Sequence, residues 1–171
     1  MTLRRTLWLA ASFCALSAAT TTALAQPVPA THALRVLTPE AAQKAVNAAL
    51  QACRQAGYQV AVAVVDRSGV AQAMVRDRFA GAHTPVVATD KAWTAVSFRT
   101  DTTELARATQ PGQASSGLRN VPRFTAVGGG VTIQGAGSVI GGIGVSGAPS
   151  GEADEACAKA GIDSIRVDLE M

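Results

Sequence analysis

Apolar positions recur with a helical period in two stretches of the chain, one near each end of the region that follows residue 36. The first stretch begins after Thr38-Pro39, an N-cap followed by a proline at the first helical position, and stops at Gly57. The second begins after Ser150 and is expected to end at Gly161. The two apolar stripes contain Ala42, Val46, Ala49, Leu50 and Cys53 in the first helix, and Ala153, Ala156, Cys157 and Ala160 in the last.

Strand patterns between these helices come in adjacent pairs. Residues 58–66 are apolar on both alternating faces, which is typical of a central strand covered on both sides. After a turn that closes at Gly69, residues 70–77 return as a more polar partner. Two glycine-punctuated strands are predicted near residues 125–133 and 138–145.

Two further helices are predicted between the strand pairs. One starts at Thr84-Pro85, and a short one starts at Asp101, where Glu104 completes a capping-box pattern. Because the strands pair as hairpins and do not alternate with helices, the sequence predicts an α+β fold. We expect an α-β-α sandwich with a mainly antiparallel sheet of about five strands and helices on both faces.

The first 25 residues have the pattern of a secretory signal peptide. Arg4 and Arg5 precede an apolar run over residues 7–19, and residues 23–25 read Ala-Leu-Ala, a cleavage site. This predicts an exported protein, periplasmic or secreted, that does not itself span a membrane. Residues 26–36 are predicted to be a flexible tether, and residues 37–171 a single domain.

The charge balance argues against a nucleic-acid partner. Without Arg4 and Arg5, thirteen basic residues face twelve acidic ones, and they form no basic cluster. The bias toward arginine favours a small anionic ligand, because guanidinium groups suit carboxylates and phosphates. Ordinary solvated surface arginines are the alternative interpretation.

The glycine-rich close of the chain contains a literal G-x-G-x-x-G at residues 142–147. In a dinucleotide site this string follows the first strand of a βαβ unit, with further strands after it. Only 24 residues follow Gly147, too few for the rest of such a fold. The glycines are therefore interpreted as turns and close helix–strand contacts, although an anionic group at the start of the Ser150 helix fits the physics.

Few residues offer site chemistry. The two histidines, His32 and His83, have no neighbours at metal-ligand spacing, and no nucleophile elbow is present, so no catalytic constellation is predicted. His83 lies in a small-residue loop before a helix and is the candidate metal or ligand contact. Cys53 and Cys157 lie on apolar helix stripes, where they form either a disulfide or two buried thiols.

Read together, these segments resemble the GlcG/HbpS-type haem-binding family, which also occurs fused to corrinoid adenosyltransferases. The resemblance covers about residues 37–162. It is carried by VAVVDRSG at residues 62–69, DKAWTAVSF at 90–98, TTEL at 102–105, GGGV at 128–131 and GGIGVSGAPSGEADEACAKAG at 141–161.

The resemblance implies a profilin-like fold that assembles into homo-oligomers, from dimers to octamers. It implies haem as cofactor, with roles in iron sensing or haem degradation beside a membrane-bound sensor. Histidine or threonine reaches the iron in this family, which makes His83, Thr94 and Thr102 the candidates. Arg76 and Arg99 are candidate partners for the haem propionates.

Two other functions stay open at this point. One is an accessory protein or small-molecule enzyme for organic-acid or aromatic catabolism. The other is a corrinoid-binding module, which the family's fused members suggest, although no adenosyltransferase segment is recognised in these 171 residues.

Overall fold

The computed structural model describes residues 28–170. The predicted signal peptide, residues 1–25, lies outside the described residues. Residues 28–36, the described part of the predicted tether, form no helix or strand and are exposed. The first side chain of the folded domain to be buried is that of Leu37.

The domain contains one antiparallel sheet of four strands, where about five were expected. The strand order is β2-β1-β4-β3, so that each neighbouring pair runs antiparallel. The elements follow the chain as α1 (Pro39–Gln55), β1 (Ala61–Asp66), β2 (Ala71–Arg76), α2 (Thr84–Phe98), α3 (Thr102–Ala108), the 3-10 turn η1 (Ser116–Asn120), β3 (Gly130–Gly135), β4 (Ser138–Ser146) and α4 (Gly151–Leu169).

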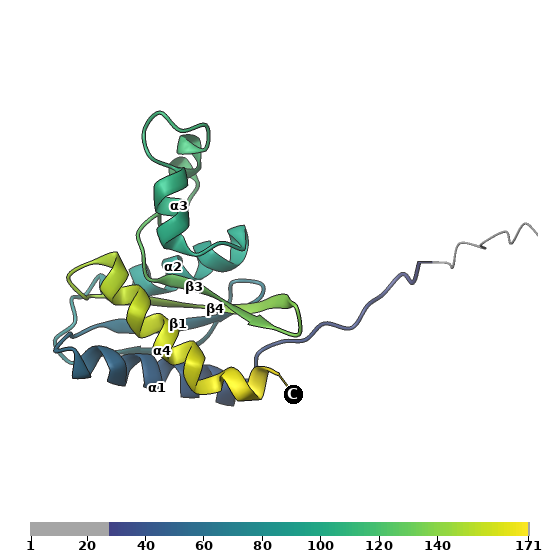
Figure 1. Cartoon of the computed structure of the whole chain (residues 1–171), viewed down its shortest axis with the longest axis horizontal. Coiled ribbons are helices and arrows are strands. Elements are labelled where there is room, and N and C mark those ends of the chain that lie inside the picture. The colour runs from purple at the N-terminus through teal and green to yellow at the C-terminus, as the bar shows by residue number, and fades with distance from the viewer. Residues whose placement is uncertain (1–27, 171) are drawn as a thin grey trace, which may run out of the picture. The chain divides into compact units, whose positions relative to one another are not determined.

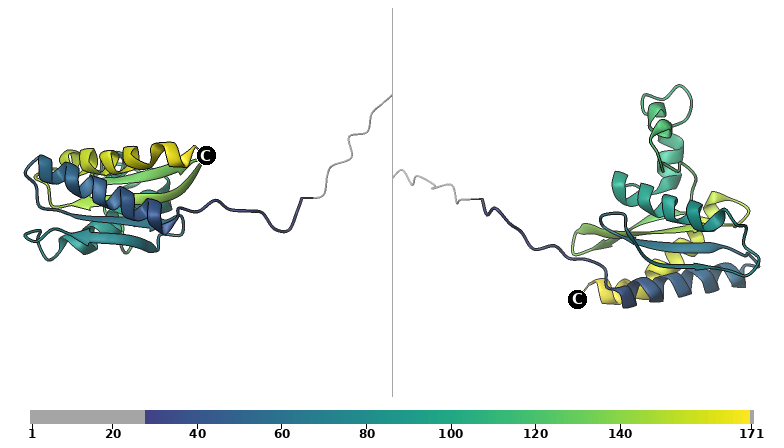
Figure 2. Two further views of the ribbon diagram at one scale, coloured as in Figure 1. Left: turned by 90° about the horizontal axis from the view of Figure 1, so that it is seen from below. Right: turned by 180° about the vertical axis from the view of Figure 1, so that it is seen from behind.

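Helices cover both faces of this sheet, which confirms the α+β sandwich. α1 and α4 lie side by side on one face, and α2 lies on the other (Figures 1 and 2). α3 and the segment after it stand off the sandwich on the α2 side (Figure 1). Because α2 is alone on its face, the edge strand β2 is left largely uncovered there, and its residues are exposed or half-buried.

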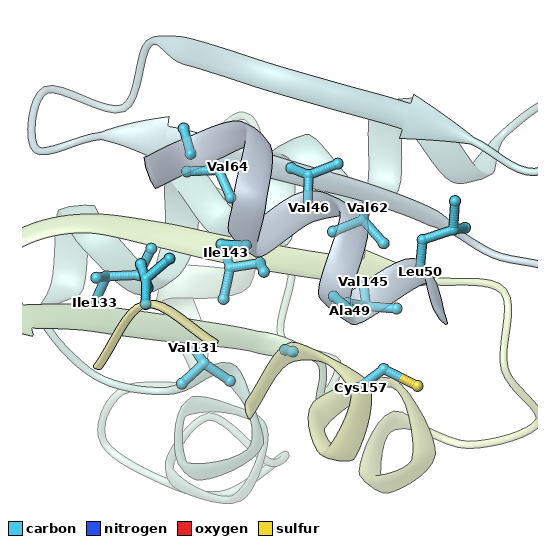
Figure 3. Packing of buried hydrophobic residues seen from close by; sticks show 14 of the residues in the cluster. Val46, Ala49, Leu50, Val62, Val64, Val131, Ile133, Ile143, Val145 and Cys157 are labelled. Atoms are coloured by element: carbon cyan, nitrogen blue, oxygen red, sulfur yellow. The ribbon is translucent and has the colours of Figure 1, made fainter. Parts of the chain in front are cut away.

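The main core lies between the sheet and the α1–α4 pair. Val62 and Val64 of β1 and Ile143 and Val145 of β4 meet Val46 and its neighbours on α1 (Figure 3). This pattern is the one that the apolar stripes and the doubly apolar strand predict. The two cysteines lie in the same layer and are bonded as a Cys53–Cys157 disulfide, which joins α1 to α4 with 5.5 Å between the Cα atoms.

The opposite face is packed by very small residues. Gly142 and Gly144 of β4 face α2 together with Ala61 and Ala63 of β1, which pair with Ser146 and Gly144. A Cβ atom at Gly144 would overlap the carbonyl oxygen of Ala88 in α2. The glycines of the G-x-G-x-x-G string therefore let the α2 backbone lie directly on the strand.

Two local predictions were wrong. α4 does not end at Gly161 but continues to Leu169, because Gly161 is buried where a Cβ atom would come within 2.8 Å of the carbonyl oxygen of Ala45. Asp101 precedes α3 but makes no capping hydrogen bond. Its carboxylate instead accepts the backbone N–H of Thr132 at 2.9 Å and so binds the outer edge of β3.

Candidate functional site

A cleft opens where α2 and α4 both begin. Its volume is about 360 Å³, and its walls come from the loop before α2, the end of β4 and the first turn of α4. The polar side chains in its lining are His83, Thr84, Lys91, Ser146, Ser150 and Asp154. The glycine-rich signature of the sequence thus forms one wall of the cleft.

A buried ion pair lies at the floor of the cleft. The Nζ atom of Lys91 lies 2.7 Å from Oδ2 of Asp154 and donates to the carbonyl oxygen of Val145 at 2.9 Å. The other oxygen of Asp154 accepts the backbone N–H of Ala148 at 2.9 Å. Burial raises the pKa of the Asp154 carboxyl, and the hydrogen bond from Lys91 opposes that rise.

Glycine makes room for this pair. Gly129 has a φ of +114°, and a Cβ atom there would lie 3.0 Å from Nζ of Lys91 and 2.6 Å from Cβ of Asp154. A side chain at this position would push the two charged groups apart. The GGG run at residues 128–130 is therefore part of the site as well as of the fold.

His83 stands at the rim of the cleft with a free imidazole. It occupies the N-cap position of α2 without a capping hydrogen bond, and it is exposed. No other residue between 28 and 170 hydrogen-bonds to its ring. The absence of a side chain at Gly81 leaves space for the imidazole, since a Cβ atom there would lie 2.7 Å from Cε1.

A second, shallow hollow lies against the first turns of α2, and His83 is not part of its lining. Met74, Pro85 and Val86 line this hollow together with Thr89 and Asp90, and Met74 is 50% and Val86 64% exposed. Met74 and Arg76 point to the same face of β2, because they pair with Ala63 and Ala61. We call Met74, Pro85 and Val86 the α2 patch.

Ion pairing and hydrogen bonds hold the loop over residues 77–83, between β2 and α2. Asp77 is buried, and its carboxylate receives two hydrogen bonds from Arg54 of α1, at 2.7 and 2.9 Å. These bonds, against the opposing effect of burial, lower the pKa of Asp77 to about 2. Arg76 donates to the carbonyl oxygen of Ala80 in the same loop. Arg76 and His83 are thus brought to one end of α2.

The other predicted site residues lie elsewhere. Thr94 and Thr102 are fully buried, and their hydroxyls hydrogen-bond backbone groups: Thr94 accepts from Thr125 and Thr102 accepts from Gly130. Arg99 is the C-cap of α2, sixteen residues after His83, a rise of about 24 Å along a helix. Arg99 and His83 therefore lie at opposite ends of α2.

Sequence reasoning missed Lys91 and Asp154, although a signal was present. Lys91 falls between Ala88, Ala92 and Ala95 at the spacing of a buried stripe. Asp154 has the same relation to Cys157, Ala158 and Gly161. A charged residue on the apolar face of each of two helices indicates a buried pair.

Two further features concern residues 28–170. No group of three or more His, Cys, Asp or Glu side chains is placed to hold a metal ion in this part of the chain. None of its helices has the length and apolar composition needed to cross a membrane.

Fold and site together define a small α+β sandwich with a histidine-rimmed cleft at the heads of two helices. The family model described as "Haem degrading protein HbpS-like" matches residues 37–163. The chain therefore belongs to the HbpS-like family.

Two solved structures are similar over most of both chains. A doubly substituted form of HbpS from Streptomyces reticuli is 39% identical, with a TM-score of 0.74, over 82% of this chain and 97% of that one. A complex of PduOC with haem is 33% identical, with a TM-score of 0.72, over 77% of this chain and 96% of that one.

A longer relative matches in part. The corrinoid adenosyltransferase PduO of Salmonella typhimurium is 36% identical over 71% of this chain. The match spans only 36% of the length of that relative.

Proposed function

We propose that the chain is an exported haem-binding protein that acts in haem or iron binding or sensing. The observation that carries the proposal is the free imidazole of His83 at the N-cap of α2, whose first turn also contributes Pro85 and Val86 to the exposed α2 patch. Membership of the HbpS-like family and similarity to a haem-bound PduOC chain support haem as the ligand. The family description adds haem degradation as a candidate activity.

The residues at this end of α2 suit the parts of haem. An imidazole is a common axial ligand of haem iron, and the α2 patch offers apolar surface to the macrocycle. The guanidinium of Arg76 lies on the same strand face as Met74 and suits a propionate. When bound, haem supplies an iron centre. The chain contributes binding, orientation and charge.

The shallow form of the patch favours a homo-oligomer, between a dimer and an octamer, in which a second copy covers the haem. Phe79, 79% exposed in the loop before His83, adds to the apolar surface open to such a contact. Light scattering with and without haemin tests this part, and a monomer in both states would contradict it. We also propose a membrane-bound sensor as a partner. The test is whether such a sensor co-purifies with the protein from membranes.

Titration with haemin tests the central claim. The purified protein should give a saturable Soret shift, and His83→Ala should weaken binding by at least about tenfold, because the axial ligand is lost. His32→Ala is the matched control, since His32 is the other histidine of the chain and is also exposed. A wild-type response no larger than that of albumin would rule out specific haem binding.

The result for His32→Ala distinguishes haem binding itself from the choice of His83 as the ligand of the iron. Weaker binding in His32→Ala, with no change in His83→Ala, would move the axial ligand to residue 32 and leave haem binding intact. A stronger response to cobalamin than to haemin would favour the corrinoid alternative, which the partial match to PduO keeps in view. The catabolic alternative predicts instead a small organic acid or aromatic as the tightest ligand.

Export is proposed from residues 1–25 and is supported by the Cys53–Cys157 disulfide, since such bonds persist in oxidising compartments. Fractionation of a bacterial host should place the protein outside the cytoplasm. Its N-terminal sequence should start near Gln26. A cytoplasmic product that retains Met1 would contradict export.

A further inference from the structure

The heads of two long helices meet in the cleft. α2 has 15 residues and α4 has 19, and the first N–H groups of a helix have no carbonyl partner within it. Ser150 caps α4 by accepting the N–H of Ala153 at 3.2 Å, and Gly151, the first residue of α4, lines the cleft. The start of α4 therefore turns its partial positive charge toward the cleft. At the start of α2 the N–H of Thr84 is already taken by the carbonyl of Gly81, and Pro85 has none.

Ser146 adds an independent observation. It is only 5% exposed, it lines the cleft, and its hydroxyl makes no hydrogen bond with any residue between 28 and 170. Buried hydroxyls normally have a partner. The residues of β4 that precede Ser146 on the face toward α2 are Gly142 and Gly144, which have no polar side chain to bond it. Ser146 thus brings to the cleft, from an almost fully buried residue, an accessible hydroxyl that has no partner among residues 28–170.

Lys91 leaves one more donor. An ammonium group has three N–H bonds, and two of them are taken by Asp154 and by the carbonyl of Val145. Both oxygens of Asp154 already accept, one from Lys91 and one from Ala148. The ion pair is therefore neutral as a unit and has one N–H left for a ligand.

We propose that this cleft binds a small monocarboxylate whose oxygens accept from Lys91, Ser146 and the first turn of α4. The start of α4 beside a neutral ion pair suits one negative charge, whereas a dianion such as phosphate would bury a second charge without a partner. A volume of about 360 Å³ leaves room for a short acid. Such a carboxylate comes either from a free acid or from an arm of a larger ligand, and we assign it to a free acid.

Besides Asp154, a second carboxylate lies in the first turn of α4. Glu152 is exposed on the first turn of α4, and its own backbone N–H, followed by the Ser150 hydroxyl, lowers its pKa. This effect indicates that the start of α4 stabilises negative charge. Because Glu152 does not line the cleft, a buried acid does not have to displace it.

Amide NMR on the haem-free protein tests the proposal with acetate as the probe, at constant ionic strength. Acetate should shift the amides of residues 146–151 in a saturable way, and phosphate should bind more weakly. The test does not depend on haem binding, which a separate titration measures. Failure to see saturable acetate shifts would overturn the cleft as a carboxylate site, and tighter binding of phosphate would overturn the monoanion.

Ser146→Ala should lower the affinity for acetate by about tenfold, as loss of a hydrogen bond to a charged group does. Ser138→Ala is the matched control, because Ser138 lies at the other end of the same strand. Equal affinity in the wild type and in Ser146→Ala would overturn the assigned contact. The affinity of Lys91→Met for acetate is informative only if its NMR spectrum shows a folded protein. The test of the assigned contact therefore rests on Ser146→Ala.

Addition of haemin to the acetate complex identifies the source of the carboxylate. Acetate that stays bound supports a separate site for a free acid. Displacement of acetate by haemin, but not by an iron-free porphyrin ester that lacks carboxylates, would overturn the free acid in favour of a propionate arm.

Discussion

Lys91 of α2 and Asp154 of α4 form an ion pair across the edge of the sheet, with 2.7 Å between Nζ and Oδ2 and both side chains at least 95% buried. The pair links α2, on one face of the sheet, to α4, on the other face. Its hydrogen bonds to Val145 and Ala148 also fix the end of β4 and the loop before α4. The geometry of the cleft thus depends on two residues that are 63 positions apart.

Removal of either partner should destabilise the fold strongly. Lys91→Met or Asp154→Leu should cost about 3–5 kcal/mol, because the remaining charge is buried without a partner. The double variant should cost less than the sum of the two. Urea unfolding of all three variants gives the coupling energy.

The exposed pair Lys44–Asp168 provides the control. Its charged atoms lie 2.8 Å apart, close to the 2.7 Å of the buried pair, but both side chains are about half exposed. Lys44→Met should therefore change stability by less than about 1 kcal/mol. Similar losses for Lys44→Met and Lys91→Met would contradict the argument from burial.

Asp77 should make the fold sensitive to acid. Its pKa falls from the usual 3.8 to about 2 in the folded state, mainly through the hydrogen bonds from Arg54. Between these pH values the unfolded chain binds more protons than the folded one, so this stabilisation is complete above pH 4 and is lost as the pH falls toward 2. Urea midpoints measured from pH 5 to pH 2 should show this loss.

Two variants isolate the pair. In Asp77→Asn the acid-dependent loss should become smaller, and Arg54→Met should reduce it to a similar extent, since each removes the same interaction. Unchanged acid sensitivity in both variants would assign the effect to other carboxylates.

The sequence predicted those parts of the fold where periodicity and turn residues agree. The hairpin between β1 and β2 has this agreement: Asp66 accepts the N–H groups of Ser68 and Val70, and Gly69 has a φ of +80°. Gly161 was misleading because the sequence alone does not distinguish a glycine that ends a helix from one that lets two helices pack closely. Its role depends on α1, which is more than a hundred residues away.

The site was harder to predict. His83 could be singled out from its loop, but Thr94 was grouped with it through the family resemblance and Arg99 through its residue type. The structure separates them, because α2 places His83 and Arg99 at opposite ends and turns Thr94 inward. Lys91 was overlooked because a buried lysine needs a partner that only the tertiary structure identifies.

The Cys53–Cys157 disulfide should contribute to stability through the unfolded chain. It closes a loop with a sequence separation of 104 between α1 and α4, so reduction should cost about 2–5 kcal/mol. Urea midpoints with and without a reductant test this. The variant with both cysteines changed to alanine should lose the dependence on reductant, and a dependence that persists would point to another effect of the reagent.

The last prediction concerns the glycine row under α2. Gly144→Ala should prevent α2 from seating on β4, because the new methyl group would overlap the carbonyl oxygen of Ala88, a backbone atom that cannot rotate away. We expect a loss of at least about 1–3 kcal/mol, or an insoluble product, since overpacking against backbone relaxes poorly. Gly117→Ala is the control, because no atom lies within 4 Å of a Cβ there. Soluble yield and urea midpoints compare the two, and equal stability would mean that α2 can shift outward at low cost. In that case the small residues would not set the depth at which Lys91 is buried, and the cleft would owe its shape to the ion pair alone.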